Sequence, residues 1–298
     1  MSQIAFFGAI ETGLLFGLVA LGVYVSFRVL QFPDLTVDGS LPLGAAVAAT
    51  LIVHGWNPYL ATVAAALAGS VAGLVTAWLT VRLKILNLLA SILTMTALFS
   101  VNLRIMGKPN QALLGQVTIF SDIEKLQLPF YVSSLLVYLV VAVVVMLALN
   151  WFLGSQIGLA MRATGANTRM ARAQGIRTDA MTLLGMAVSN AMVSLAGAMM
   201  AQSQGGADVS MGIGVIVTGL AAVILGEAVF STRTIIRATA ACVGGAILYR
   251  MAVAAALNAS FIGLQAQDLK LITAILVAVA MTLPSVRGRL FQRLGGAK

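Results

Sequence analysis

Long apolar segments recur along nearly the whole chain and decide what it can fold into. A helix that spans a membrane needs about 20 mostly apolar residues, because its backbone groups must pair with one another inside lipid. We identify nine such segments, near 4–27, 39–55, 58–81, 85–106, 129–153, 178–203, 212–230, 234–257 and 268–286. We therefore predict an all-α fold, a polytopic transmembrane helical bundle of about 8–9 spans that forms one domain over residues 1–298.

The composition excludes a soluble globular protein. Charged residues make up only 9% of the chain, whereas soluble domains carry about 25%. The net charge of +9 does not indicate nucleic acid, because Lys and Arg gather between the predicted spans, as they do in the cytoplasmic loops of membrane proteins. We expect membrane lipid as the surroundings and no nucleic-acid partner.

Four groups of Lys and Arg predict the orientation. They are Arg82 with Lys84, the loop 154–177, Arg233 with Arg237, and the tail from Arg287. With nine spans all four groups lie on one side, which the positive-inside rule makes the cytoplasm, and the N-terminus lies outside. If segment 39–55 is instead a re-entrant hairpin, the N-terminus lies inside.

Residues suited to catalysis are sparse. The chain has a single histidine, His54, and a single cysteine, Cys242, and neither can build a metal cluster or a catalytic set alone. Nucleotide-binding and hydrolase motifs are also missing from the sequence. We predict no catalytic residue, no metal site and no cofactor in this chain.

Polar residues inside the predicted spans are candidates for a substrate pathway, because polar groups in hydrocarbon must face protein, water or ligand. Thr94 and Thr96 lie near the expected midplane of the fourth segment, and Asn190 lies near that of the sixth. Threonine hydroxyls can instead bond their own backbone, and Asn190 can join helices. Glu11 lies at an expected depth similar to that of Arg250, so the two could form a structural ion pair or line the pathway.

Two carboxylates flank the short second segment. Pro33 disfavours helix at the residue before it, and Asp38 then follows in the position of an N-cap that opens the next helix. Asp38 could equally end a broken helix that faces a substrate cavity, as in many transporters. The two roles are compatible, and we place Asp38 in the predicted pathway with Thr94, Thr96, Asn190 and Glu11.

The loop of about 154–177 carries the most distinctive motif. It reads Gly158-Leu-Ala-Met-Arg-Ala-Thr-Gly-Ala-Asn167 and continues to Gln174-Gly-Ile176. The loop is too polar to lie in lipid and too short to form a domain, so we predict that it docks a soluble partner on the cytoplasmic face.

This loop, with Gly219-Leu-Ala-Ala-Val-Ile-Leu-Gly226 and Phe32-Pro-Asp-Leu-Thr-Val-Asp-Gly-Ser40, resembles the permease subunits of bacterial ABC importers. The similarity is to the branched-chain amino acid and ribose permease group. Within it, the chain looks like the branch associated with lipoprotein-like binding proteins, some of which are linked to aromatic amino acids. Glu227 stands where a second glycine is common in the group.

The resemblance implies a non-catalytic subunit of an ATP-driven importer for a small polar solute such as an amino acid, in the bacterial cytoplasmic (inner) membrane. Its implied partners are a second copy of the chain, a dimer of ABC ATPases that holds ATP and Mg, and a periplasmic or lipid-anchored solute-binding protein. The loop would be a coupling helix. Its docking candidates are Arg162, Gly165, Asn167, Arg172 and Gly175. A stand-alone secondary transporter or channel is the alternative.

Overall fold

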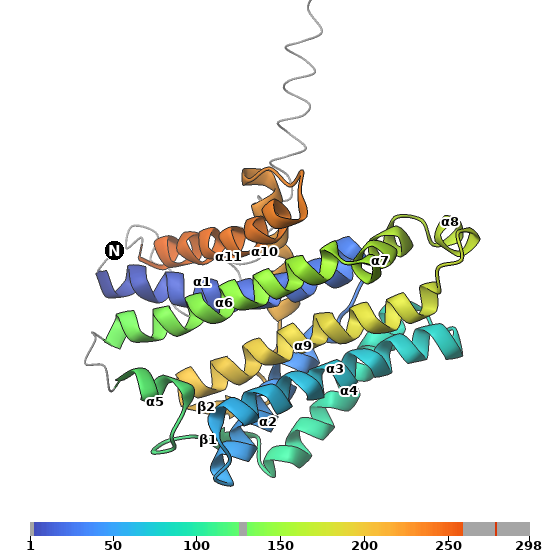
Figure 1. Ribbon diagram of the computed structural model, residues 1–298. Helices are drawn as coiled ribbons and strands as arrows, with labels where there is room; N and C mark the ends of the chain where they lie inside the picture. The colour runs from blue at the N-terminus through green and yellow to red at the C-terminus, as the bar shows by residue number, and fades with distance from the viewer. Residues whose placement is uncertain (1–2, 125–129, 259–277, 279–298) are drawn as a thin grey trace, which may run out of the picture.

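The computed structural model describes residues 3–124, 130–258 and 278 (Figure 1). Its elements are α1 (Gln3–Val23), the π-helix η1 (Tyr24–Val29), α2 (Val37–Val53), α3 (Pro58–Leu83), α4 (Asn87–Met106), β1 (Asn110–Ala112), α5 (Ile119–Glu124), α6 (Phe130–Gly154), α7 (Gln156–Ala166), α8 (Thr168–Ala173), α9 (Thr178–Gln204), β2 (Gly206–Asp208), α10 (Val215–Val229) and α11 (Ile235–Asn258). The predicted all-α bundle is confirmed. The two strands form only a small antiparallel pair, with Gln111 opposite Ala207.

Six helices of the described chain are long and apolar enough to cross a membrane. They are Ala5–Val29 (α1 with η1), α3, α4, α6, α9 and α11. The predicted segments 39–55 and 212–230 correspond to the shorter apolar helices α2 and α10. The ninth predicted segment, 268–286, lies outside the described residues except for Ala278.

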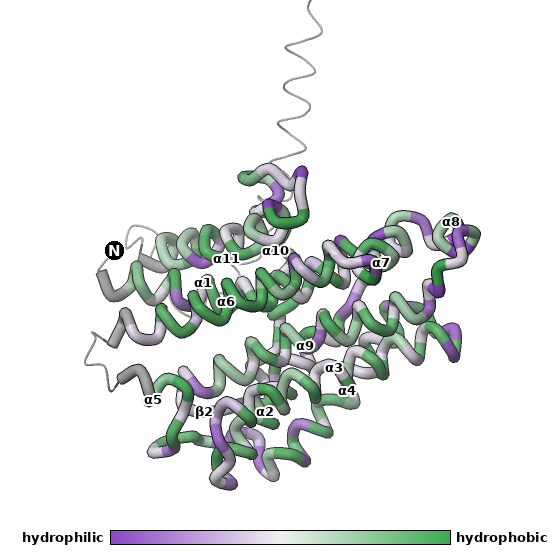
Figure 2. The backbone as a smooth tube through the Cα atoms, in the orientation of Figure 1, coloured by the Kyte–Doolittle hydropathy of each residue, from purple (hydrophilic) through white to green (hydrophobic). Residues whose placement is uncertain are grey.

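Hydrophilic residues gather at the two ends of the bundle and hydrophobic ones along its length (Figure 2). We call the end that carries α7 and α8 the inner end, and the end that carries β1 and β2 the outer end. The basic loops cluster at the inner end, which the positive-inside rule assigns to the cytoplasm.

Helix α9 is the centre of the packing. It contacts α2 and α3 on one side and α1 on the other (Figure 1). Glycine makes the contact with α3 possible, because a Cβ on Gly69 or Gly73 would overlap the backbone carbonyl oxygens of Asn190 or Met186. This G-x-x-x-G spacing lets the two backbones approach closely, as in other membrane helix pairs.

Two further crossings are broken into a part that is not helical and a short helix. After η1 ends at the inner end, residues 30–36 run without helix into the bundle, where α2 begins and continues to the outer end. In the other crossing, the chain leaves β2 at the outer end, runs through residues 209–214, and forms α10 toward the inner end. At 1.5 Å per residue α2 is about 25 Å long and α10 about 22 Å, less than the roughly 30 Å of a bilayer core.

Segment 39–55 is therefore not a re-entrant hairpin. Its start contacts Thr76 and Asn190 through neighbouring polar groups, and its last turns reach Ile105 near the outer end of α4. The chain enters this crossing at the inner end and leaves it at the outer end. The arrangement agrees with the orientation in which the N-terminus lies outside.

Candidate functional site

The N-terminal ends of the two short helices meet inside the bundle, and Asp38 joins them. Its carboxylate accepts hydrogen bonds from the backbone N–H groups of Gly214 (3.1 Å) and Ile216 (2.8 Å). These donors belong to the first turn of α10, which has no earlier carbonyl partners and carries the positive end of the helix dipole. The carboxylate of Asp38, on α2, therefore caps the N-terminus of α10, the short helix of the other broken crossing.

The expectation that Asp38 caps its own helix is wrong. Helix α2 begins at Val37, two residues earlier than an Asp38 cap would place it, with Thr36 as its N-cap. Asp38 therefore lies inside the first turn, and its side chain binds α10. Asp34 lies nearer the start of α2, where its Oδ1 accepts from the Thr36 N–H at 2.9 Å. The Asp38 carboxylate binds the first N–H groups of α10 instead.

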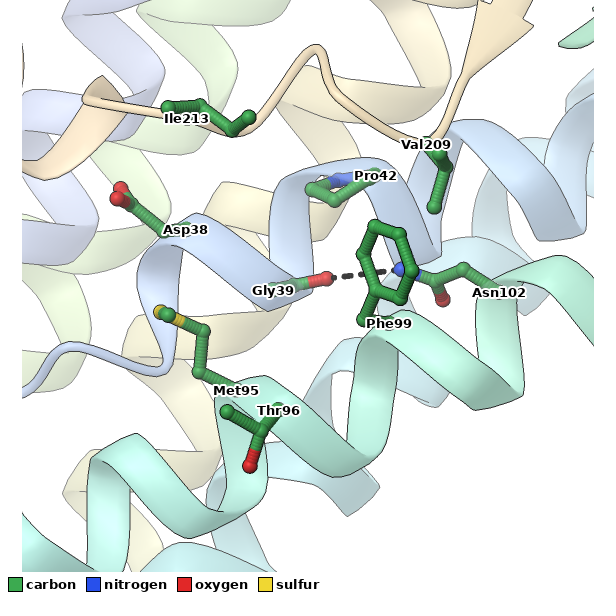
Figure 3. Close-up of a pocket in the computed structure, with 9 residues that line it drawn as sticks. All are labelled: Asp38, Gly39, Pro42, Met95, Thr96, Phe99, Asn102, Val209 and Ile213. Atoms are coloured by element: carbon green, nitrogen blue, oxygen red, sulfur yellow. Dashed lines mark hydrogen bonds between the residues drawn. The ribbon is translucent and has the colours of Figure 1, made fainter. Parts of the chain in front are cut away.

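A cavity of about 370 Å³ opens beside this junction (Figure 3). It lies between α2, α4 and the turn residues 209–214 before α10. Its lining residues are Asp38, Gly39, Pro42, Met95, Thr96, Phe99, Asn102, Val209 and Ile213. In Figure 3, Asp38 lies at one end of this set and Asn102 at the other, with Met95 and Phe99 between them. The middle is apolar. The Asp38 carboxylate is turned away from the other lining residues and binds the start of α10, and Asn102 is fully buried.

Asn102 is a site residue that the sequence analysis missed. Its side chain is fully buried, its Nδ2 donates to the Gly39 carbonyl at 3.4 Å, and its Oδ1 has no hydrogen-bond partner in the described part of the chain. A buried acceptor without a donor is costly. The sequence feature that could have identified Asn102 is an amide side chain inside an apolar segment, the same feature that singled out Asn190.

The five predicted pathway residues are not all brought together. Asp38 and Thr96 line the cavity, although the exposed Thr96 hydroxyl bonds its own backbone at Ile92 and Leu93. Thr94 bonds the Ala90 carbonyl and faces a separate apolar groove between α2, α3 and α4. Glu11 lies on α1 near the outer end.

Asn190 lies behind the cavity in the core, fully buried. Its Nδ2 donates to Asp34 Oδ2 at 2.9 Å and to the Met186 carbonyl at 3.1 Å, while its Oδ1 accepts from the Ser40 hydroxyl at 2.6 Å. These bonds tie α9 to the start of α2 and to the extended residues before it. Asn190 thus holds the broken helix in place and does not line the cavity.

Glu11 and Arg250 form no ion pair with each other in the part of the chain that is described. The Arg250 guanidinium instead lies 3.8 Å from the centroid of the Phe16 ring, a cation–π contact. At the inner end of the bundle, Glu227 forms an ion pair with Arg28 of η1. That pair ties the end of α10 to the end of the first span.

The loop 154–177 forms two helices, α7 and α8, at the inner end. Ser155 caps α7 and Asn167 caps α8, the latter by accepting from the Met170 N–H at 3.0 Å. Arg172 joins α8 to the start of α9, with Nε to the Thr178 hydroxyl at 2.7 Å and a salt bridge to Asp179 at 2.8 Å.

The five predicted docking residues differ in their surroundings. Gly165 packs against the first span, and a Cβ there would overlap the Val29 carbonyl oxygen. Gly175 forms the turn after α8 with a positive φ of 81°, a conformation that favours glycine. Asn167 and Arg172 hold the two short helices, whereas Arg162 is exposed on α7.

The site contains no grouping suited to a metal. Within residues 3–124, 130–258 and 278, no cluster of three or more His, Cys, Asp or Glu side chains is placed to hold an ion. The arrangement instead offers a cavity at the ends of two broken helices, at about half depth in an apolar bundle. Such a site can bind a small solute during passage.

These features define a multi-pass membrane protein built for transport. The comparison with known families agrees, since residues 5–283 match the family described as branched-chain amino acid transport system, permease component. The chain belongs to this family, which is a membrane component of transport systems. The expected resemblance to this permease group is thereby confirmed.

Two relatives match over nearly the whole chain. A tyrosine transport system permease protein of Clostridioides difficile (strain R20291) is 37% identical over 264 residues, which cover 89% of this chain and 86% of that protein. An uncharacterized protein of Rickettsia prowazekii (strain Madrid E), RP368, is 32% identical over 280 residues, 92% of this chain and 95% of the relative. No solved structure matches the chain significantly.

Proposed function

We propose that this chain is the non-catalytic translocation subunit of an ATP-driven ABC importer for amino acids in the bacterial inner membrane. In this proposal two copies form a homodimer, and an ABC ATPase dimer binds the cytoplasmic face and holds ATP and Mg. A periplasmic or lipid-anchored binding protein delivers the solute. The observation that carries the proposal is the family match over residues 5–283 together with helices α7 and α8 at the inner end.

The shape of α7 and α8 supports a docking role. The two helices are short, capped at their N-termini by Ser155 and Asn167, and fixed to α9 through Arg172. Gly165 of α7 packs on the first span, and Arg172 of α8 binds the start of α9. A displacement of α7 and α8 would therefore move the first span and α9 directly. A rigid element of this kind transmits motion from a soluble partner to membrane helices.

Tyrosine is the first substrate to test, because the relative from Clostridioides difficile is described as part of a tyrosine transport system. We propose that the solute passes the cavity beside Asp38 and Thr96, while Asn190 and Thr94 support its walls and Glu11 lies nearer the outer entrance.

The test is uptake by the reconstituted assembly. The permease, its ATPase and its binding protein are placed in liposomes, and uptake of radiolabelled tyrosine is followed with ATP inside. We expect uptake that needs ATP hydrolysis and stops when the phosphate-binding lysine of the ATPase is replaced. Uptake driven by an ion gradient, without the ATPase, would support the alternative of a stand-alone secondary transporter and refute the proposal.

A further inference from the structure

We propose that a basic pocket at the inner end binds the phosphate headgroup of an anionic phospholipid, whose acyl chain lies along the lipid-facing side of α3. The pocket has a volume of about 350 Å³ and lies between the last turn of α3, the end of α8 and the first turns of α9. It is separate from the cavity beside Asp38, which lies between α2, α4 and residues 209–214. The inference therefore goes beyond the proposed function and does not depend on it.

Three arginines line the pocket, and one carboxylate offsets part of their charge. The arginines are Arg82 of α3, Arg172 of α8 and Arg177 at the start of α9, and Asp179 is the single acidic side chain among the described lining residues. Asp179 is already paired with Arg172 at 2.8 Å. The side chains of Arg82 and Arg177 make no hydrogen bond or ion pair within the described part of the chain. Two guanidinium groups thus line one pocket without a counter-charge, and guanidinium groups bind phosphate through paired hydrogen bonds.

The aromatic residues of α3 place the pocket at the level of the lipid headgroups. Tyr59 near the start of α3 and Trp78 near its end are both about half exposed, and these two residue types collect at the two interfaces of a membrane. Along a helix their separation is about 28 Å, close to the roughly 30 Å of a bilayer core. Arg82 follows about one turn after Trp78, so its guanidinium lies where the phosphates of the cytoplasmic leaflet are found.

An exposed apolar stripe on α3 leads to the pocket. Leu67, Val71, Leu74 and Trp78 recur at helical spacing and therefore share one side of α3, and Arg82 continues the same series. All four apolar residues are exposed, Leu67 by 62% and Val71 by 59%. In a membrane helix such a side faces the lipid chains. A phospholipid on this side can place its acyl chain on the stripe and its phosphate beside Arg82.

The other walls of the pocket favour a lipid over a soluble anion. Val81, Ile176 and Leu183 add apolar surface beside the arginines. A free phosphate would contact the guanidinium groups alone, whereas the glycerol and first methylene groups of a phospholipid also cover this apolar surface. A zwitterionic phospholipid brings its own cation, which Arg82 and Arg177 repel. The pocket therefore selects a phospholipid with net negative charge, as other basic pockets on the cytoplasmic side of membrane proteins do.

The experiment measures lipid binding to the purified full-length permease, without ATPase or binding protein, by native mass spectrometry from a nonionic detergent. Dioleoyl phosphatidylglycerol is the anionic probe, and dioleoyl phosphatidylcholine is the zwitterionic probe with the same acyl chains. We expect the wild type to bind phosphatidylglycerol about thirtyfold more tightly, since each arginine near the membrane surface contributes about fivefold. The double variant Arg82→Gln with Arg177→Gln should remove most of this preference.

A matched variant separates the pocket from the net charge. Arg233→Gln with Arg237→Gln removes two exposed arginines that lie at the same end but outside the pocket, and it should leave the preference unchanged. The thermal unfolding midpoint reports whether each variant folds. A second measurement uses the wild type alone, with a phosphatidylglycerol that carries a photoreactive headgroup. Its crosslinks should map to residues 78–83 and 172–183, and crosslinks elsewhere alone would contradict the site.

Three further results would overturn the inference. The wild type could bind the two lipids equally, or the two double variants could lose the preference to the same extent. Competition by glycerol 3-phosphate at millimolar concentrations would mean that the pocket is a site for a soluble phosphate. If the variant with Arg82→Gln and Arg177→Gln binds phosphatidylglycerol like the wild type but no longer binds the ATPase, the pocket receives an acidic segment of that partner instead.

Discussion

Replacing Asn190 with leucine should destabilise the folded permease by about 1–6 kcal/mol. Asn190 makes buried hydrogen bonds to Asp34 and Ser40 outside α9, and one to the Met186 carbonyl within α9. Hydrogen bonds between membrane helices average about 0.6 kcal/mol each, which gives roughly 1 kcal/mol for the two that leave α9. Asp34 Oδ2 and the Ser40 hydroxyl would lose their partner, while Asp34 Oδ1 keeps its bond from the Thr36 N–H. A buried group left unpaired costs about 1–3 kcal/mol, which sets the upper value for the two.

The assay is reversible unfolding of the purified protein by increasing mole fractions of SDS. The double variant Asp34→Asn with Asn190→Leu should recover part of the loss, because it removes the buried charge that has lost its Asn190 donor. A double-mutant cycle measures that coupling. Thr96→Val is the matched control, since the exposed Thr96 hydroxyl bonds only its own helix. If Asn190→Leu unfolds at the same SDS fraction as the wild type, the role of Asn190 in fixing α2 is refuted.

Three further substitutions test the inner end. Arg162→Glu, on the exposed face of α7, should lower permease-stimulated ATPase activity several-fold without changing thermal stability, whereas the charge-matched Lys108→Glu, also exposed but near the outer end, should not. Gly165→Ala should lower the unfolding temperature by several degrees even without the ATPase, because its Cβ would overlap the Val29 carbonyl oxygen; an unchanged melting curve would contradict this. Arg28→Glu should weaken transport, and the added change Glu227→Arg should restore part of it if their ion pair matters; equal activity of the single and double variants would show that it does not.

Most of the fold could be predicted because length and apolarity are local properties. Eight of the nine predicted segments coincide with a helix of the described chain, and the ninth lies mostly outside the described residues. The broken crossing at 30–53 was also visible, since Pro33 and two aspartates interrupt the apolar pattern. The break before α10 was predicted between segments 178–203 and 212–230, but it extends to residue 214. Residues 212–214 contain no proline or charge and so were placed in the apolar segment.

The site was predicted less well because its partners are distant in the sequence. Thr94 and Thr96 are two residues apart on α4, so their side chains point in different directions, one into an apolar groove and the other toward the cavity. Asn190 and Asn102 looked alike as amides in apolar segments. Only their neighbours distinguish them, since Asn190 is fully bonded and Asn102 keeps a free oxygen.

Asp38 shows why the centre of the molecule could not be read from its local sequence. A helix that begins inside a membrane must have acceptors for its first N–H groups, because neither water nor lipid supplies them there. The residues around Pro33 meet this need twice, with Asp34 at the start of α2 and Asp38 at the start of α10. The N-termini of α2 and α10 meet at Asp38, and from there α2 runs to the outer end and α10 to the inner end. The two helices thus point in opposite directions, although their sequences show no matching repeat. Local rules placed the carboxylate correctly at a helix start. They assigned it to the wrong helix because the donors it binds lie about 176 residues further along the chain.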